Sequence, residues 1–461
     1  MADHVFVLSR DREFADGLTS RLIAAGLAAD EIEHHSHVDE LGRQMAAVPF
    51  STVFVDFREQ SQVLELGRFF QELRNGRLGA VDLVSVSQGS LPLEFAAAAE
   101  LYAVKSLRVP FTQGECERVA EFVAAGGRVN GHRRLPPSRT LAAEGFSITS
   151  CEIEMCGMLD LLERVAPRDV TLLLVGETGT GKTTLAQIIH SLSPRRDEPF
   201  HNVACGALPP DLIESDLFGH ARGAFTGAER DKIGRFEAAR RGTLLLDEID
   251  VLGPKEQVKL LRVIETGQFE PVGTTRTRES QARLIVAANV DLERCVESRQ
   301  FRSDLYYRLN VLQFRLPPLR ERLIDIAPMA ISFIQECCQQ HNIRIRRVGR
   351  DFLDVLKRYP WPGNIRELKN QVQRAVLFNE DGTLTAADLP NAVRQAMRNG
   401  SPPADDNGRH LSLAERVARN ERKILEEELQ IHNQCRTTTA KSLGISRVGL
   451  YKKMKKYGML R

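Results

Sequence analysis

The sequence predicts an α/β protein with a small all-α domain toward its C-terminal end. In the first 125 residues, short apolar runs alternate with stretches of helical period, the pattern of parallel strands covered on both faces. Farther along, a glycine-rich loop follows a buried strand and leads into a helix. Residues 437–457 read as a helix, a glycine turn and a second helix. These observations predict a doubly wound domain, a second α/β domain and a helical domain.

The composition is that of an ordinary globular protein. A length of 461 residues fits about three domains, and the contents of 42% hydrophobic and 27% charged residues are typical. No run approaches the ~18 apolar residues that span a bilayer, and the N-terminus lacks a secretory signal, so we expect a cytoplasmic protein without membrane contact. The eight cysteines lack metal-site spacing and are expected to be reduced thiols.

The charge is unevenly distributed although the net charge is only +2. After Glu428 there is no acidic residue and there are eight basic ones, so the preceding part of the chain is net negative. An acidic body with a basic tail indicates that only the C-terminal end meets a polyanion.

In the N-terminal domain, Asp56 follows one of the expected strands. These strands are at residues 5–8, 52–55, 81–86 and 103–107, with helices at 14–25 and 64–73. The layout over residues 1–125 resembles the receiver domain of response regulators, in which an aspartate at a strand end accepts a phosphoryl group. However, Ser9 and Arg10 stand where receivers have a metal-binding acidic pair, and Val109 replaces a lysine. We therefore expect a degenerate receiver-like domain with slow or absent phosphotransfer.

A phosphate-binding loop follows a polar linker predicted over residues 126–146, a helix at 152–165 and a strand at 170–175. It comprises Gly176, Glu177, Thr178, Gly179, Thr180, Gly181, Lys182 and Thr183, and a helix follows at 184–190. Glycines let backbone N–H groups wrap phosphates, Lys182 reaches the β- and γ-phosphates, and the Thr183 hydroxyl ligates Mg²⁺. The loop therefore predicts ATP and Mg²⁺ as ligands.

Two carboxylates, Asp247 and Glu248, end an apolar strand that begins at residue 243. Beside a phosphate-binding loop, Asp247 is expected to hold Mg²⁺ and Glu248 to polarise the attacking water. Taken alone, two acids at a strand end could instead cap a helix.

A small uncharged loop with one aromatic side chain lies between these two motifs. It comprises Gly223, Ala224, Phe225, Thr226, Gly227 and Ala228. Glycines near both ends allow the loop to hinge, although the bare string also fits a surface turn with a buried Phe. Inside a nucleotide-binding domain, it resembles the signature of the sigma-54-dependent activators, the bacterial enhancer-binding proteins of the AAA+ class. The resemblance implies that the loop contacts sigma-54 RNA polymerase and moves with the nucleotide state.

The resemblance to this family runs nearly unbroken over residues 151–390, and it implies an AAA+ ATPase domain with a helical lid at 147–393. It implies that Asn289 is the first nucleotide sensor and Arg366 the second. Arg302 and Arg308 would be arginine fingers that reach the γ-phosphate of a neighbouring subunit. By spacing alone, the two arginines would be an ordinary solvated face.

Three positions depart from the family pattern. Thr183 stands in place of a glutamate, a change toward the general P-loop pattern, and Ala288 replaces a threonine. Ala204 replaces an asparagine that restrains the catalytic glutamate in the family. Asn202 lies ~6.6 Å away along the strand, which is too far for a simple substitution. These departures put the control of hydrolysis in question but not catalysis itself.

The C-terminal part contains a linker and a DNA-binding domain. Residues 394–412 are polar and rich in turn formers, which predicts a flexible linker, and residues 413–431 have the period of a helix that could support a dimer contact. The domain at 413–461 resembles the Fis-type helix-turn-helix of the family. We expect Arg447 to reach a base edge. The phosphate contacts are expected to come from Lys452, Lys453, Lys455 and Lys456. The alternative is a basic tail without groove contact.

The resemblance to this family, together with these features, implies an ATP-dependent transcription activator that binds upstream double-stranded DNA. It would assemble from dimers into a hexameric ring and remodel closed complexes of sigma-54 RNA polymerase. Two alternatives remain open. One is a DNA-binding regulator that binds ATP with little or no hydrolysis, which Ala204 and Ala288 keep open. The other is an AAA+ ATPase that remodels another substrate, which the hexapeptide at 223–228 disfavours.

Overall fold

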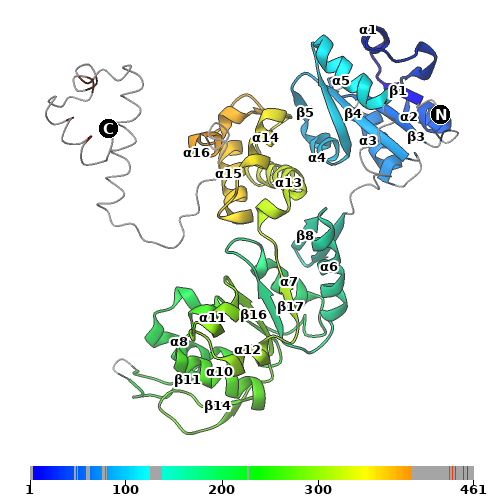
Figure 1. Cartoon of the computed structure of the whole chain (residues 1–461). Coiled ribbons are helices and arrows are strands. Elements are labelled where there is room, and N and C mark those ends of the chain that lie inside the picture. The colour runs from blue at the N-terminus through cyan, green and yellow to red at the C-terminus, as the bar shows by residue number, and fades with distance from the viewer. Residues whose placement is uncertain are drawn as a thin grey trace. The chain divides into compact units, whose positions relative to one another are not determined.

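The computed structural model describes residues 4–45, 48, 50–58, 63–74, 78, 80–124, 138–225 and 228–395, and positions 436, 439, 442, 450 and 454 (Figure 1). The chain divides into two units, Met1–Gly400 and Ser401–Arg461. In the described part of the chain, no helix is long and apolar enough to cross a membrane. The described cysteines are all free thiols.

The N-terminal domain is a doubly wound α/β domain with a parallel sheet in the order β2-β1-β3-β4-β6. This order corresponds to that of flavodoxin-like folds, so the receiver-like fold is confirmed. Its strands are β1 (His4–Leu8), β2 (Ile32–His35), β3 (Phe50–Asp56), β4 (Ala80–Ser87) and β6 (Ala103–Arg108). Its helices are α1 (Arg12–Ala24), α2 (Val38–Met45), α3 (Val63–Arg74), α4 (Leu93–Tyr102) and α5 (Gln113–Ala124).

Alternate residues of β1 belong to two different cores, which explains its continuous apolar run. Val5 and Val7 are buried with residues of α1 and α5, whereas Phe6 and Leu8 are buried with residues of α2, α3 and α4. A strand covered on both faces has no solvent side and needs no polar alternation.

The second domain is built on a parallel sheet in the order β10-β13-β16-β9-β17. Its strands are β9 (Leu172–Val175), β10 (Phe200–Ala204), β13 (Thr243–Asp247), β16 (Arg283–Ala288) and β17 (Gln313–Arg315). Its helices are α6 (Ile153–Val165), α7 (Lys182–Ser191), α8 (Pro210–Phe218), α9 (Arg235–Ala238), α10 (Pro254–Thr266), α11 (Leu292–Glu297) and α12 (Ser303–Leu309). The small antiparallel pairs are β11 (Gly219–His220) with β12 (Lys232–Ile233), and β14 (Gln268–Phe269) with β15 (Arg278–Glu279). The phosphate-binding loop, the two carboxylates and Asn289 all follow carboxyl ends of parallel strands, which meet at one edge of the sheet.

The linker predicted over residues 126–146 is wrong in its second half. Strands β7 (Arg139–Ala143) and β8 (Phe146–Ser150) form an antiparallel hairpin. Glu144 and Gly145 connect them with positive φ angles of 37° and 84°, which suits a two-residue turn of this kind. Leu141 of β7 is buried in the core that contains residues of α6 and α7. Turn-forming residues fit a linker as well as a hairpin, so the prediction placed the boundary too late.

A helical lid follows β17. It comprises α13 (Leu323–His341), α14 (Arg350–Arg358), α15 (Asn364–Phe378) and α16 (Asn391–Gln395), with the short strands β18 (Arg347–Gly349) and β19 (Thr383–Leu384). This arrangement confirms the predicted AAA+ layout of an α/β domain with a helical lid.

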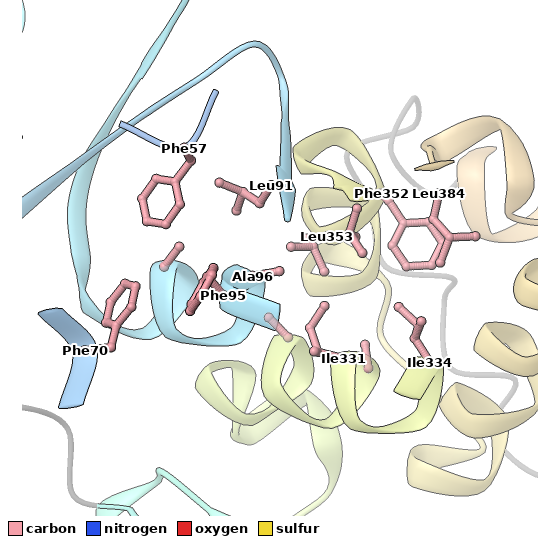
Figure 2. Packing of buried hydrophobic residues seen from close by; sticks show 14 of the residues in the cluster. Phe57, Phe70, Leu91, Phe95, Ala96, Ile331, Ile334, Phe352, Leu353 and Leu384 are labelled. Atoms are coloured by element: carbon pink, nitrogen blue, oxygen red, sulfur yellow. The ribbon is translucent and has the colours of Figure 1, made fainter. Parts of the chain in front are cut away.

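The N-terminal domain and the lid share a sheet and a core. Strand β5 (Ser90–Pro92) pairs antiparallel with β18, and β18 pairs parallel with β19. Figure 2 shows Leu91 and Phe95 of the N-terminal domain beside Ile331 and Leu353 of the lid, and these residues belong to one buried cluster. The two segments, separate in the sequence, are therefore joined in space by backbone pairing as well as apolar burial.

Candidate active site

A cavity of ≈ 200 Å³ lies at the carboxyl edge of the second sheet. It gathers residues from the phosphate-binding loop, the acidic strand end, the end of β16 and lid helix α15. The lining residues are Thr178, Gly179, Gly181, Lys182, Thr183, Thr184, Asp247, Glu248, Asn289, Ile365, Arg366 and Lys369. Most of the residues predicted from the sequence for the nucleotide site therefore meet around one cavity.

Lys182 is the buried cation of this site. Its Nζ donates to the carbonyl oxygens of Gly176 (2.6 Å) and Glu177 (3.0 Å) and to Oδ1 of Asn289 (2.7 Å). Burial lowers the pKa of Lys182, and the charges of Asp247 and other nearby carboxylates oppose this shift. A buried ammonium held at a cavity wall is suited to bind an anionic phosphate chain, where new oxygen partners would replace some of these contacts.

Thr183 and Asp247 supply hard oxygen ligands at the same wall. The Thr183 hydroxyl donates to Oδ2 of Asp247 over 3.0 Å, so the two side chains already lie within reach of each other. Mg²⁺ is bound in nucleotide sites by one or two such groups together with phosphate oxygens and water. The donor set therefore fits Mg²⁺ accompanied by a nucleotide.

Glu248 is held by Asn289 and by a close backbone approach. Asn289 Nδ2 donates to Oε1 of Glu248 over 3.2 Å, and a Cβ added to Gly206 would lie 1.9 Å from Oε2. Glu248 itself has φ 59°, a left-handed conformation that is uncommon outside glycine. The hydrogen bond from Asn289, at the end of β16, therefore restrains the Glu248 carboxylate.

The strand register explains why β10 does not supply this restraint. Ala204 lies beside Asp247, and Asn202 lies beside Leu245, farther down the sheet. Asn202 is therefore displaced along β10, in agreement with the argument from sequence.

Arg302 and Arg308 lie outside the cavity. Arg302 pairs with Asp304 at 2.7 Å and Arg308 with Glu265 at 3.0 Å. The two arginine side chains are 47% and 62% exposed, respectively. Within one chain they do not line the cavity, and their side chains are exposed enough to face another molecule.

Sequence reasoning missed several residues around the site. Ile365 and Lys369 line the cavity from α15 together with Arg366, and the helical spacing from Arg366 to Lys369 could have indicated a shared face. Gly176, Glu177 and Thr180 do not line it. The Glu177 side chain, predicted as part of the nucleotide site, is bonded to Arg320 and Asn364 instead.

The described part of the hexapeptide loop extends from the β11–β12 pair. The Gly223 amide donates to the Ala228 carbonyl over 2.8 Å, which closes the base of the loop, and Gly223 has φ 81°. The Phe225 side chain is 38% exposed, and its ring meets the His220 ring edge-on with centroids 4.9 Å apart. Phe225 is therefore partly open to solvent. Thr226 and Gly227 lie outside the described residues.

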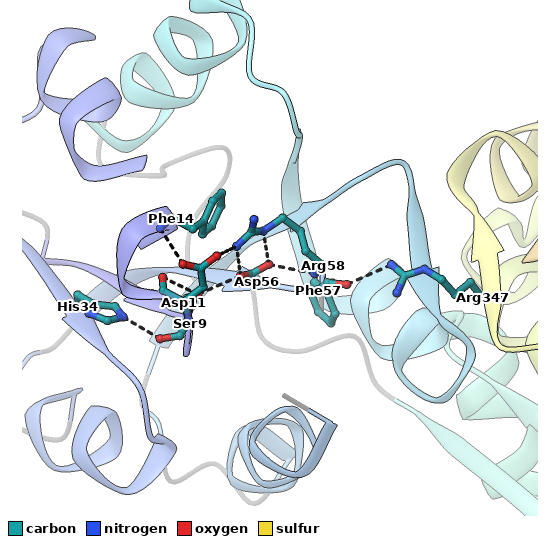
Figure 3. A network of polar contacts seen from close by, with 8 residues as sticks. All are labelled: Ser9, Asp11, Phe14, His34, Asp56, Phe57, Arg58 and Arg347. Carbon is teal, nitrogen blue, oxygen red and sulfur yellow. Dashed lines mark hydrogen bonds and ion pairs between the residues drawn. The ribbon is translucent and has the colours of Figure 1, made fainter. Parts of the chain in front are cut away.

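The Asp56 pocket of the N-terminal domain is built around an arginine (Figure 3). Arg58 donates from Nε to Oδ1 of Asp56 (3.0 Å) and from Nη2 to Oδ2 (2.9 Å), and it also donates to Asp11 (3.0 Å). The Ser9 hydroxyl donates to Asp56 over 2.9 Å, and the Phe14 ring stacks against the guanidinium. Both carboxylates are engaged by Arg58, so this donor set does not fit the Mg²⁺ of a working receiver.

The predicted DNA contacts, Arg447, Lys452, Lys453, Lys455 and Lys456, lie outside the described residues, as does the helix predicted at 413–431. The linker predicted at 394–412 begins too early, because residues 394 and 395 belong to α16, and the rest of it lies outside the described residues.

The sheet order, the phosphate-binding loop, the acidic strand end and the helical lid define a P-loop ATPase domain of the AAA+ class. Residues 148–315 match the sigma-54 interaction domain, residues 320–406 match the AAA+ ATPase lid domain, and residues 417–457 match the Fis family of bacterial regulatory proteins. The chain belongs to the family of sigma-54-dependent activators.

Named relatives match this chain over part of its length. The chain is 41% identical over 305 residues to the regulatory protein AtoC of Escherichia coli, covering 66% of each chain. It is 45% identical over 251 residues to the Nif-specific regulatory protein of Azospirillum lipoferum, covering 54% of this chain and 40% of the relative. It therefore spans between 40% and 66% of the length of these two relatives.

A solved structure covers nearly the whole chain. NtrX from Brucella abortus, crystallised in complex with ATP, aligns over 99% of this chain and 100% of its own, with a TM-score of 0.54 and 26% sequence identity. The similarity includes the N-terminal domain, which the three domain matches leave out.

Proposed function

We propose that this protein is an ATP-driven transcription activator that remodels sigma-54 RNA polymerase at promoters. The observation that carries the proposal is the meeting of Lys182, Asp247, Glu248, Asn289 and Arg366 around one cavity, in a domain that also carries the hexapeptide loop. The match to the sigma-54 interaction domain and the presence of ATP in the NtrX structure support it.

Each residue at the cavity has a distinct role in this proposal. Lys182 binds the β- and γ-phosphates, and Glu248 orients and polarises the attacking water while Asn289 holds its carboxylate in place. Thr183 and Asp247 would hold Mg²⁺, which when bound would neutralise charge on the phosphates. Arg366, on lid helix α15, places a positive charge beside the nucleotide. The hydrogen bond from Asn289 restrains Glu248 in place of the asparagine that Ala204 replaces. Steady-state ATP hydrolysis decides against or for the alternative of a regulator that binds ATP without turnover.

The proposal places Arg302 and Arg308 in trans, at the nucleotide of a neighbouring subunit in a ring. Both side chains are exposed and neither lines the cavity of its own chain, which supports this assignment. A guanidinium supplied across an interface stabilises the charge that develops in phosphoryl transfer. ATPase activity per subunit is therefore expected to rise with protein concentration as rings form.

Mixing two inactive variants tests the trans assignment. Arg308→Ala subunits keep Glu248, and Glu248→Ala subunits keep Arg308, so an equal mixture should restore turnover at about a quarter of all subunit interfaces in the ring. Steady-state ATP hydrolysis measures this result. Arg294→Ala, at an exposed arginine of α11, is the matched control and should keep full activity. Activity that neither mixing nor dilution changes would show that the arginines act within one chain.

The C-terminal domain is proposed to bind upstream double-stranded DNA. The match of residues 417–457 to the Fis family supports this part of the proposal. Arg447 would read a base edge, and the lysines at 452, 453, 455 and 456 would contact phosphates. With DNA and RNA polymerase as partners, the activity belongs in the bacterial cytoplasm.

The N-terminal domain is proposed to work without phosphotransfer, because Arg58 and Ser9 occupy the oxygens of Asp56. A small phosphodonor such as acetyl phosphate should leave Asp56 unlabelled, as intact-mass measurement would show. Asp56→Asn should keep promoter activation unchanged, since an amide oxygen still accepts from Arg58. Alanine is unsuitable because it would leave a buried guanidinium without these acceptors. Stoichiometric labelling of Asp56 together with altered activity would overturn this part of the proposal.

A further inference from the structure

The carboxylate of Glu177, in the middle of the phosphate-binding loop, faces the lid. Arg320 donates to it through both guanidinium ends, from Nη2 to Oε1 (2.6 Å) and from Nη1 to Oε2 (2.8 Å). Asn364 Nδ2 also donates to Oε2, over 3.1 Å. The hydrogen bond from Arg320 lowers the pKa of Glu177 against the opposing effect of burial, so the side chain is ionised at neutral pH.

Asn364 ties three separate segments together through one amide. Its Nδ2 donates to Glu177 and to the Thr178 carbonyl (3.1 Å), and its Oδ1 accepts from the Leu319 amide (2.8 Å). The side chain is fully buried, and the residue has φ 51°, which asparagine tolerates better than most residues. An apolar residue here would leave several buried polar groups without partners.

Two further hydrogen bonds join the loop to the lid, one from the backbone of α15 and one from the Arg322 side chain just before α13. The Ile365 amide donates to the Gly179 carbonyl over 3.0 Å, and Arg322 Nη2 donates to the Thr180 carbonyl over 3.2 Å. Gly179 has φ 81°, and a Cβ there would lie 2.3 Å from the Gly363 carbonyl oxygen. The phosphate-binding loop therefore lies directly against the start of α15, whose Arg366 lines the cavity.

We propose that Glu177, Arg320 and Asn364 form a clasp that holds lid helix α15 against the phosphate-binding loop. The three are positioning residues, because they set where Arg366 stands relative to the nucleotide without touching it themselves. Turning the Glu177 carboxylate toward Arg320 also keeps a negative charge away from the phosphate chain. The clasp rests on the proposed ATPase function and deepens it by assigning what positions the second sensor.

Loss of either charged residue of the clasp, Glu177 or Arg320, is expected to have the same consequence. Glu177→Gln and Arg320→Gln should each weaken the affinity for a non-hydrolysable ATP analogue by about three- to tenfold, the range expected when a half-exposed charged contact is lost. The double variant should be no weaker than either single variant, because both remove one interaction. The exchanged pair Glu177→Arg with Arg320→Glu should recover part of the affinity. Arg262→Gln, which breaks the similar pair between Arg262 of α10 and Glu270 after β14, is the matched control.

The chain contains an intrinsic reporter for the lid, its single tryptophan. Trp361 is fully buried three residues before Asn364, donates from Nε1 to the Leu356 carbonyl (2.7 Å) and meets the Tyr359 ring edge-on. Its fluorescence emission should shift to longer wavelength in both single variants and return in the exchanged pair. A merely local change in the loop would leave this emission unmoved.

The experiment separates the clasp from its alternatives. Weaker binding in Glu177→Gln with normal binding in Arg320→Gln would mean that the carboxylate acts on the nucleotide directly, and the clasp would be wrong. Unchanged affinity and emission in all variants would also refute it. If the unmodified chain bound no nucleotide, the proposed function would fail, whereas the Trp361 emission of the same variants would still decide the clasp.

Discussion

Lys182→Ala is expected to weaken ATP binding by about two orders of magnitude or more, because it removes the charged hydrogen bonds that the phosphates would receive. The same substitution also leaves Asn289 without its bond from Nζ, and Asn289 holds Glu248. Hydrolysis should therefore fall below detection even at ATP concentrations that force binding. Equilibrium titration with a fluorescent ATP analogue measures the first effect, and steady-state turnover measures the second.

The control for this substitution is Lys255→Ala, at an exposed lysine of α10 that does not line the cavity. It changes the net charge equally and should bind the analogue normally. Thermal unfolding of both variants should show that the fold is kept. An unchanged affinity in Lys182→Ala would mean that the glycine-rich loop has another purpose in this chain.

Phe225→Ala is expected to uncouple ATP hydrolysis from promoter opening. Phe225 is partly exposed on the hexapeptide loop and lies outside the group of residues that line the cavity, so turnover and operator binding should stay close to those of the unmodified chain. Loss of a large apolar contact from a buried interface commonly costs ~2 kcal/mol or more, which corresponds to about a thirtyfold weaker engagement of the polymerase. Open-complex formation should therefore be lost. Thr226→Ala is expected to behave in the same way.

A matched control separates contact by the loop from a general loss of apolar surface. Phe378→Ala removes the same side chain from the lid, where it is 78% exposed. This variant should open promoters normally. If both Phe225→Ala and Thr226→Ala opened the promoter as well as the unmodified chain, the loop would not be the coupling element.

The sequence was sufficient to predict the elements of the nucleotide site, because each belongs to a short contiguous motif. Lys182 and Thr183 belong to one glycine-rich motif at the start of α7, and Asp247 and Glu248 stand together where β13 ends. Parallel strands bring their carboxyl ends to one edge, so these motifs had to meet. The alternation of strands and helices likewise predicted the receiver-like sheet.

The clasp could not be predicted in this way because its partners are distant in the sequence. Glu177 is separated from Arg320 by 143 positions and from Asn364 by 187. A glutamate inside a phosphate-binding loop suggests a nucleotide contact until the lid is placed beside it. The bond from Asn289 to Glu248 is hidden for the same reason, since the two residues follow different strands.

Short elements were also missed. Strand β5 contains three residues, and its partner β18 lies in the lid, so no local period indicates their pairing. The hairpin of β7 and β8 contains residues typical of linkers. Only the burial of Leu141 against α6 and α7 distinguishes this hairpin from a linker. In both cases the secondary structure depends on tertiary contacts and cannot be predicted from the local sequence alone.

The most direct test of the central claim is promoter opening by the unmodified chain. The purified protein would be combined with sigma-54 RNA polymerase and a promoter bearing an upstream binding site, and strand separation would be followed by permanganate reactivity of unpaired thymines. Strand separation should appear with ATP and this protein together and be absent with a non-hydrolysable analogue. Active ATP hydrolysis without strand separation in the complete mixture would contradict the assignment of this protein as a sigma-54 activator.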